Sequence, residues 1–324
     1  SGFSHIFKHD GGDSFGWGWK LDLAEGSYLA RPLNIFQEDR MANLTDELEW
    51  RTIQWEDLKG REDISTDELR ERKVYGSARG VWRDVGRTRQ LGAADGYTVS
   101  VLHLGSKYAD DLYDDGVIYH FPSTKQPTTD SREIASLKNT EVASLPVFVI
   151  SRGNRSDTRK VQLGFVSESQ HDRCLILFSD TPLASALPKA EETNEPFEIL
   201  KSGTRKTRTQ TATTRSASFK YGVETRCGRE CALCDIKHPD LLEAAHVIPV
   251  SDGGPDDPRN GLVLCATHHR AFDAFLFSIE PRTHEILTSS NISLRELGIT
   301  KTRIKESIAP ANEALKYRFD KLQP

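Results

Sequence analysis

The chain has 324 residues, enough for two domains with separate cores, and its 37% hydrophobic and 28% charged residues are typical of a soluble globular protein. No apolar run approaches the ~20 residues of a membrane span, and the first residues carry no apolar signal segment. We therefore expect no membrane association and a cytoplasmic location. The net charge of −5 does not by itself indicate a nucleic-acid-binding protein. However, eight Lys or Arg residues lie within 201–230, and a local basic stretch can bind phosphate.

The N-terminal part predicts irregular chain followed by two helices. Residues 1–40 carry Gly, Trp and Phe and indicate irregular chain with short strands. The spacing of apolar residues predicts a helix over 45–58 with Thr45 as its N-cap. A second helix is predicted over 66–75, where Thr66 is followed by acidic residues in the first turn.

Alternating, β-branched segments then predict a sheet. Five strands are expected, at 97–105, 116–121, 145–153, 159–169 and 173–179. A helix is predicted among them over 131–143. Strands that surround one or two helices indicate a curved, mostly antiparallel sheet, so the expected fold class is α+β. We place this first domain at 1–185.

The rest of the chain predicts a linker and a second domain. Residues 186–218 hold few large apolar side chains and much Thr, Ser and Lys, which is typical of a basic linker. The second domain, 219–324, is predicted to begin with a helix over 219–230. It is expected to contain a strand pair within 275–289 and to end in a helical tail over 293–322.

The cysteines indicate a metal site. Four of the five lie at Cys227 or later, which favours metal binding in a reducing compartment over a disulfide framework. Cys231 and Cys234 form a CxxC motif, and Cys265 and His268 form a CxxH motif. Together they offer the four ligands of a closed tetrahedral site. We therefore expect a structural zinc ion.

Four further residues lie between and beside these ligands: His246, Asn260, His269 and Asp273. A structural zinc does not use them, and they are residue types that a hydrolytic site needs. A neutral imidazole can take a proton from water near pH 7. His269 and Asp273 are four residues apart, so on a helix their side chains share one face and can bind one divalent ion.

Residues 225–285 resemble the HNH endonuclease family, whose ββα-metal fold is a two-stranded hairpin followed by a helix. The resemblance rests on the CxxC motif, AAHVIP, a Gly-rich loop that ends in NG, LCATHH and a final Asp, in the family's order. It implies that His246 is the general base and that Asn260 orients its imidazole. It also implies that His269 and Asp273 bind a catalytic Mg²⁺, Mn²⁺ or other divalent ion, while zinc holds the fold.

One position departs from the family's pattern. Many members carry a metal ligand directly before the base histidine, where this chain has Ala245. The ion is then held by fewer protein ligands, or Glu243 assists. Other interpretations stay open: a plain zinc finger with His246 as a core histidine, Asp273 as a capping or ion-pairing residue, and His238 as a competing zinc ligand.

The stretch from 75 to 153 resembles the SRA (SET- and RING-associated, YDG) domain, a PUA-like sheet fold that flips a modified cytosine out of the duplex. The resemblance is carried by GSARGVWRDVGRT, DGYTVSVLHLGSKYADDLYDDG, VIYHFPST, SLKN and LPVFVISRG. It implies that Tyr108 and Phe121 stack on the flipped base and that Asp111 accepts from the cytosine amino group. Tyr119 is a neighbouring alternative to Phe121. The alternative interpretation of Tyr108 and Phe121 is that both are core aromatics.

Together the two resemblances imply a modification-dependent DNA endonuclease, similar to type IV restriction enzymes, with an SRA-like reader fused to an HNH nuclease. The expected partner is double-stranded DNA that carries 5-methyl- or 5-hydroxymethylcytosine, and the expected state, by analogy, is a homodimer. Arg79, Arg83 and Arg87 either contact phosphates or face water. The alternatives are a non-catalytic reader with a structural zinc module, and an HNH nuclease whose first domain senses a different modification or RNA.

Overall fold

The computed structural model describes residues 43–76, 79–104, 112–184, 196–198, 216–289 and 291–322. The chain divides into two units, Ser1–Asp39 and Arg40–Pro324, and every described residue belongs to the second. The expectations for 1–40 and for most of the linker therefore lie outside the described residues. No helix within the described ranges is long and apolar enough to cross a membrane.

A single sheet of seven strands organises the first domain. Its strands are β1 (Ile64–Ser65), β2 (Val81–Trp82), β3 (Ser100–His103), β4 (Gly116–His120), β5 (Pro146–Arg152), β6 (Thr158–Ser169) and β7 (Arg173–Phe178). The order is β2-β3-β5-β6-β7-β4, and β1 pairs with β6. Neighbouring strands are antiparallel except β3 and β5, which are parallel. The prediction of a mostly antiparallel α+β sheet domain is confirmed.

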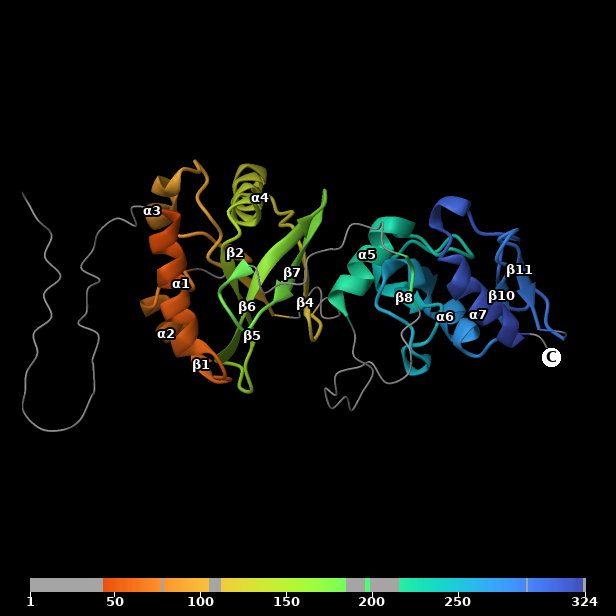
Figure 1. Ribbon diagram of the computed structural model, residues 1–324. Coiled ribbons are helices and arrows are strands. Elements are labelled where there is room, and N and C mark those ends of the chain that lie inside the picture. The colour runs from red at the N-terminus through yellow and green to blue at the C-terminus, as the bar shows by residue number, and fades with distance from the viewer. Residues whose placement is uncertain are drawn as a thin grey trace, which may run out of the picture. The chain divides into compact units, whose positions relative to one another are not determined.

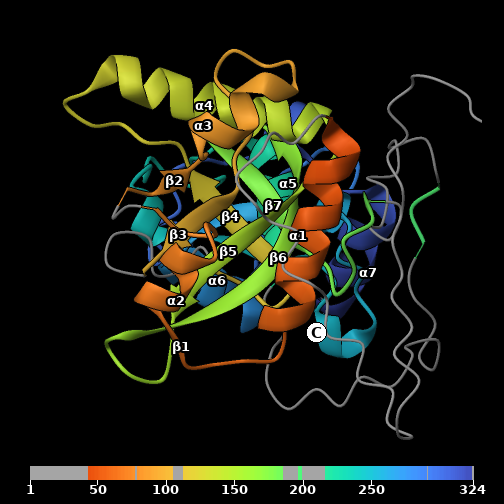
Figure 2. The ribbon, with the colours of Figure 1, turned by 90° about the vertical axis from the view of Figure 1, so that its left-hand side faces the viewer.

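Helices cover both faces of this sheet. They are α1 (Leu44–Leu58), α2 (Thr66–Glu71), α3 (Val85–Thr88), the short 3-10 helix η1 (Arg89–Leu91) and α4 (Pro127–Val142). Alternate side chains of β5 point to opposite faces. Phe148 and Ile150 share a buried cluster with Trp50 of α1, whereas Val147 shares one with Leu137 of α4. The two longest helices therefore pack on opposite faces of the sheet (Figure 1, Figure 2).

The N-cap of α1 lies two residues before the predicted Thr45, whereas α2 begins at the predicted residue, Thr66. Asn43 Oδ1 accepts a hydrogen bond from the Thr45 N–H at 2.8 Å, so Asn43 is the N-cap of α1. Ser65 Oγ accepts from the Glu68 N–H at 3.1 Å, so Ser65 is the N-cap of α2. At α1 two capping residue types, Asn43 and Thr45, are separated by one residue, and the helix begins after the first of them.

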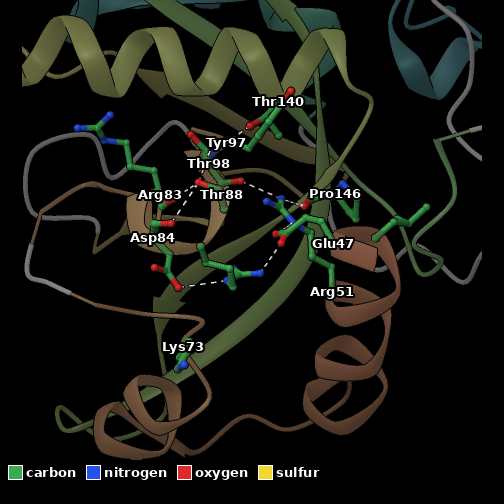
Figure 3. Close-up of polar contacts among 12 residues, drawn as sticks. Glu47, Arg51, Lys73, Arg83, Asp84, Thr88, Tyr97, Thr98, Thr140 and Pro146 are labelled. Atoms are coloured by element: carbon green, nitrogen blue, oxygen red, sulfur yellow. Dashed lines mark hydrogen bonds and ion pairs between the residues drawn. The ribbon is translucent and has the colours of Figure 1, made fainter. Parts of the chain in front are cut away.

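A buried arginine attaches α1 to the sheet (Figure 3). Arg51 Nη1 donates to the backbone oxygen of Thr98 at 2.8 Å and also to that of Pro146. Glu47, one turn earlier and fully buried, accepts from Arg51 Nε at 2.8 Å and pairs with Arg87. The charge of Arg51 is thus compensated where α1 meets the beginnings of two internal strands, β3 and β5.

The three arginines for which phosphate contact was an alternative are paired inside the domain. Arg87 binds Glu47, as described above. Arg79 Nε lies 2.5 Å from Glu133 Oε1, and Arg83 Nη1 donates to the backbone oxygen of Asp95 at 2.8 Å. Each guanidinium therefore has a structural role in the first domain.

The second domain is built around a hairpin and a helix. Its elements are α5 (Ala217–Cys227), the 3-10 turns η4 (Pro239–Leu241), η5 (Val250–Asp252), η6 (Pro258–Asn260) and η7 (Glu306–Ile308), the strands β8 (Leu242–His246), β9 (Gly261–Cys265), β10 (Phe277–Ile279) and β11 (Ile286–Thr288), and the helices α6 (Ala266–Asp273) and α7 (Asn312–Leu322). β8 pairs with β9, and β10 with β11, both antiparallel. The predicted strand pair within 275–289 is confirmed.

The tail over 293–322 was predicted to be helical, and most of its first half is not. Only the turn η7 and the helix α7 are helical there. The reason is that the N–H groups of Thr300 and Lys301 donate to the backbone oxygen of Leu233, at 3.1 and 3.3 Å. These donors are therefore used to pack the tail against the CxxC segment instead of forming helical hydrogen bonds.

Candidate functional site

The pairing of β8 with β9 places the predicted site residues at defined positions. His246, the last residue of β8, lies opposite Gly261, and Leu242 lies opposite Cys265, directly before α6. Gly261 is required for close packing: a Cβ there would overlap Val223 and come within 2.8 Å of the Phe219 ring on α5. This glycine allows α5 to approach the end of the hairpin that carries the histidine.

The four predicted zinc ligands form one buried cluster. The ligand atoms of Cys231, Cys234, Cys265 and His268 all lie within 4.8 Å of one another. His268 Nδ1 is 3.3 Å from Cys231 Sγ and 3.2 Å from Cys265 Sγ. His268 Nε2 lies 3.1 Å from the backbone oxygen of Leu297, which accepts its proton and leaves Nδ1 for a metal. Three sulfurs and one imidazole nitrogen are a donor set that fits structural zinc.

The electrostatics of the cluster favour one thiolate. Burial opposes ionisation of Cys231, but the hydrogen bond with His268 and the N–H groups of Leu233 and Cys265 outweigh it and lower the pKa of that thiol to about 6. Burial raises the pKa of Cys234 to about 12, and the neighbouring Cys231 adds to the rise. Since a thiolate is the form that binds metal, Cys231 is the ligand best prepared for it.

His246 is held on two sides. Its Nε2 lies 2.9 Å from Asp256 Oδ1. The ring of Phe219 is stacked on the imidazole, with ring centroids 3.7 Å apart and 7° between the planes. The side chain of His246 keeps 20% of its surface exposed, so the ring is accessible and not a core histidine.

Asn260 is fully buried and organises the loop between the two strands. Its Oδ1 accepts from the Ile248 N–H at 2.9 Å, and its Nδ2 donates to Ile248 O at 3.1 Å and Pro255 O at 3.0 Å. Its backbone oxygen accepts from the Val247 N–H at 2.8 Å. These hydrogen bonds of Asn260 therefore lead to the residues that follow His246, and not to the imidazole itself.

His269 lies between two carboxylates. Its Nδ1 is 2.5 Å from Glu243 Oε2, and its Nε2 is 3.5 Å from Asp273 Oδ2. Glu243 lies in β8 on the same face as Ala245, the position where many family members carry a metal ligand. Its carboxylate therefore lies on the side of the strand where that ligand would be. The hydrogen bonds of His246, by contrast, lead to a different partner, Asp256.

The two distances from His269 indicate different roles for Asp273 and Glu243. The 3.5 Å between His269 Nε2 and Asp273 Oδ2 leaves room for one ion bound to both at ~2.1 Å. The 2.5 Å between His269 Nδ1 and Glu243 Oε2 is a hydrogen-bond distance. Glu243 thus fits a carboxylate that accepts the other ring proton and fixes the ligand orientation.

The candidate base pocket of the first domain is described only in part. Tyr108 and Asp111 lie outside the described residues. Phe121 is 8% exposed and packs in a buried cluster with Tyr119, and its N–H donates to Asp172 O at 2.8 Å. The assignment of Tyr108, Asp111 and Phe121 to one pocket stays a prediction.

Two residues near the site were missed by the sequence reasoning. Asp256 contacts the predicted base, but the sequence offers Asp256 and Asp257 side by side without a pattern to separate them. Phe219 belongs to α5, and nothing in its spacing indicates contact with a histidine further along the chain. The alternative zinc ligand, His238, has 65% of its side chain exposed and stands outside the cluster.

The chain is similar to known nucleases, both by family comparison and among solved structures. The HNH endonuclease family matches residues 231–280. Among solved structures, the chain is similar to a modification-dependent TagI restriction endonuclease, at 18% identity, over 82% of this chain and 95% of that chain, with a TM-score of 0.34. It is also similar to the type IV phosphorothioation-dependent restriction endonuclease ScoMcrA, at 15% identity, over 71% of this chain and 54% of that chain, with a TM-score of 0.25. TM-scores this low do not establish a shared overall arrangement, and curated protein sequences gave no match.

The family match begins at the first cysteine of the metal cluster and runs through the hairpin and α6 to β10. It therefore covers the same ββα unit in which the structure gathers the cluster, the paired histidine and the histidine–carboxylate group. Residues 231–280 form an HNH endonuclease domain, and the protein is a nuclease.

Proposed function

We propose that the protein is a modification-dependent DNA endonuclease. Its first domain would recognise modified cytosine by base flipping, and its HNH domain would hydrolyse the phosphodiester bond at a site with one divalent ion. The observation that carries the nuclease half is the geometry of one ββα unit: a partly exposed imidazole, His246, ends the first strand, and the helix presents His269 with Asp273.

His246 is assigned as the general base. Its Nε2 faces the Asp256 carboxylate, which only accepts hydrogen bonds, so Nδ1 keeps the free lone pair. In the reaction Nδ1 takes one proton from the attacking water. The water oxygen forms the new bond to phosphorus, the bond from phosphorus to the 3′ oxygen breaks, and the leaving oxygen takes a proton from solvent.

His269 and Asp273 are assigned as ligands of the divalent ion, with Glu243 as the carboxylate that orients His269. When bound, Mg²⁺ or Mn²⁺ supplies charge stabilisation for the scissile phosphate and the leaving oxygen. The Cys₃His cluster is assigned to structural zinc. Since Cys265 caps α6 and His268 lies in its first turn, this cluster would fix the helix that carries His269.

The recognition half rests on the resemblance of residues 75–153 to SRA domains. Tyr108 and Phe121 are proposed to stack on the flipped base, at ~1–3 kcal/mol per stacked base. Asp111 is proposed to accept from the cytosine amino group, which discriminates bases by ~1–3 kcal/mol. We further propose double-stranded DNA with 5-methyl- or 5-hydroxymethylcytosine as substrate, a cytoplasmic location and a homodimer that cuts both strands.

Plasmid cleavage tests both halves. Unmodified, 5-methylcytosine, 5-hydroxymethylcytosine and phosphorothioate DNA are compared in Mg²⁺ or Mn²⁺, with His246→Ala and with His238→Ala as a matched control. His238 is exposed, lies in the same domain and stands outside the metal cluster. The expected result is cleavage of the cytosine-modified DNAs by the wild type and His238→Ala, and none by His246→Ala.

Other outcomes discriminate among the alternatives. Equal cleavage of all four DNAs would keep the nuclease and contradict the modified-cytosine reader. Cleavage of phosphorothioate DNA alone would assign a different mark. Tight DNA binding with no cleavage in any metal would support a non-catalytic reader. For the pocket itself, Tyr108→Ala and Asp111→Asn are expected to weaken binding of modified DNA ~10-fold or more, measured against an unmodified duplex.

A further inference from the structure

We propose that Asp256 is a positioning residue for the general base, whose carboxylate fixes both the tautomer and the rotation of the His246 ring. This inference rests on the proposed nuclease function, because Asp256 would act only through His246. Asp256 lies ten residues after the histidine, in the connection between β8 and β9, and its Oδ1 is 2.9 Å from His246 Nε2.

The backbone on both sides of Asp256 is held in place. Before it, Pro255 O accepts from Asn260 Nδ2 at 3.0 Å. After it, Asp257 Oδ1 accepts from the Arg259 N–H at 2.7 Å and caps the turn η6. The carboxylate is therefore carried by a segment with little freedom, which is what a positioning residue needs.

Gly254 allows the loop to close. A Cβ at this position would overlap the backbone oxygen of Ile248 and come within 2.9 Å of Asn260 Nδ2. Asn260 binds Ile248 and Pro255 at the same time and so joins the two arms of the loop. Asn260 was predicted to orient the imidazole of His246. We infer that it does so indirectly, by holding the backbone next to Asp256, which binds the imidazole.

Asp256 and Phe219 restrict different motions of the His246 ring. The parallel ring of Phe219, 3.7 Å away, restricts the tilt of the imidazole plane. Stacking does not distinguish the two edges of the imidazole, so it does not determine which nitrogen faces outward. The carboxylate does, because it only accepts hydrogen bonds and selects the tautomer with the proton on Nε2. In every molecule His246 then presents Nδ1 as the basic atom.

Replacing Asp256 is expected to change the orientation of His246 without unfolding the domain. Asp256 has 46% of its side chain exposed, and its hydrogen bond in the described part of the chain is the one to His246. The matched control is Asp252, an acid in the same connection whose Oδ2 accepts from Tyr317 Oη and Lys321 Nζ, each at 2.7 Å. Neither contact of Asp252 involves the base.

The test compares cleavage by Asp256→Ala, Asp256→Asn and Asp252→Ala with the wild type, using the modified plasmid at saturating Mg²⁺. We expect Asp256→Ala to lower kcat ~10²-fold with KM within about twofold. This loss is smaller than the ~10⁴-fold typical of a buried orienting carboxylate, because Asp256 is partly exposed. Asp256→Asn keeps an acceptor oxygen without the charge and is expected to lose ~10-fold, while Asp252→Ala retains wild-type kcat.

Nitrogen-15 NMR of histidine-labelled protein reads the tautomer directly, with His246→Gln identifying the signal. The expected spectrum shows the proton on Nε2 in the wild type and a mixture of tautomers in Asp256→Ala. Wild-type kcat or an unchanged tautomer in Asp256→Ala would overturn the positioning role while His246→Ala stays inactive. Full activity of His246→Ala would instead overturn the proposed base, and the positioning role with it.

Discussion

Loss of metal from the Cys₃His cluster is predicted to unfold the nuclease domain. The four ligand residues are at most 7% exposed, and three of them, Cys231, Cys234 and Cys265, belong to the hydrophobic core of the domain. Structural zinc contributes ~10–16 kcal/mol at pH 7 in small domains, comparable with the ~5–15 kcal/mol that stabilises a whole domain. The core cannot compensate for such a loss, and α6 would lose its anchor at His268, next to His269, the proposed ligand of the divalent ion.

Cys234→Ser tests this prediction, with Cys227→Ser as the control. Cys227 is buried in the same core but lies outside the cluster. Zinc content is measured by elemental mass spectrometry, unfolding by calorimetry and activity by plasmid cleavage. Cys234→Ser is expected to lose zinc, the unfolding transition of the nuclease domain and cleavage, while the transition of the seven-stranded sheet persists. Full zinc occupancy in Cys234→Ser, or the same unfolding temperature as Cys227→Ser, would refute the reasoning.

Three further substitutions test separate contacts. Phe219→Leu keeps the core filled but removes the ring stacked on His246, the proposed base, so kcat is expected to fall ~3- to 10-fold in steady-state kinetics with little change in unfolding temperature. Glu243→Gln is expected to raise the Mg²⁺ or Mn²⁺ concentration for half-maximal cleavage ~10- to 100-fold in a metal titration, without loss of zinc. Glu224→Gln leaves Arg173, 2% exposed, without its ion-pair partner and is expected to cost ~3–5 kcal/mol in urea unfolding. Replacing both residues of that pair with Met should recover most of the loss.

The metal cluster and the hairpin–helix unit could be predicted because their information is local. Cys231 with Cys234, and Cys265 with His268, are each three residues apart, and such spacing brings two ligands to one ion whatever the rest of the chain does. Five of the seven strands of the first sheet were also predictable, since their segments are rich in β-branched and apolar residues, whereas β1 and β2, of two residues each, were not predicted. Both predictions depend on residues close together in sequence.

Contacts that depend on the path of the backbone could not be predicted. Asp256 and Asp257 are adjacent and chemically identical, yet Asp256 binds His246 and Asp257 caps a turn. Only the course of the loop, set by Gly254 and Asn260, decides between them. The parallel pairing of β3 with β5 is likewise non-local, because the whole of α4 lies between these strands.

The helix α5 begins at Ala217, two residues before the predicted helix over 219–230. Ala217 and Tyr221 lie on one side of the helix and pack with residues of β4 and β7, whereas Phe219 and Val223 belong to the core of the nuclease domain. A helix that is apolar on two faces lacks the single stripe by which sequence patterns identify an amphipathic helix. Ala217 was assigned to the linker, but its N–H donates to Asp115 Oδ1 at 2.6 Å, and its side chain packs with residues of β4 and β7. Because Tyr221 and Phe219 lie in different cores, Tyr221→Ala would remove contacts with β4 and β7, whereas Phe219→Ala would remove the ring stacked on His246.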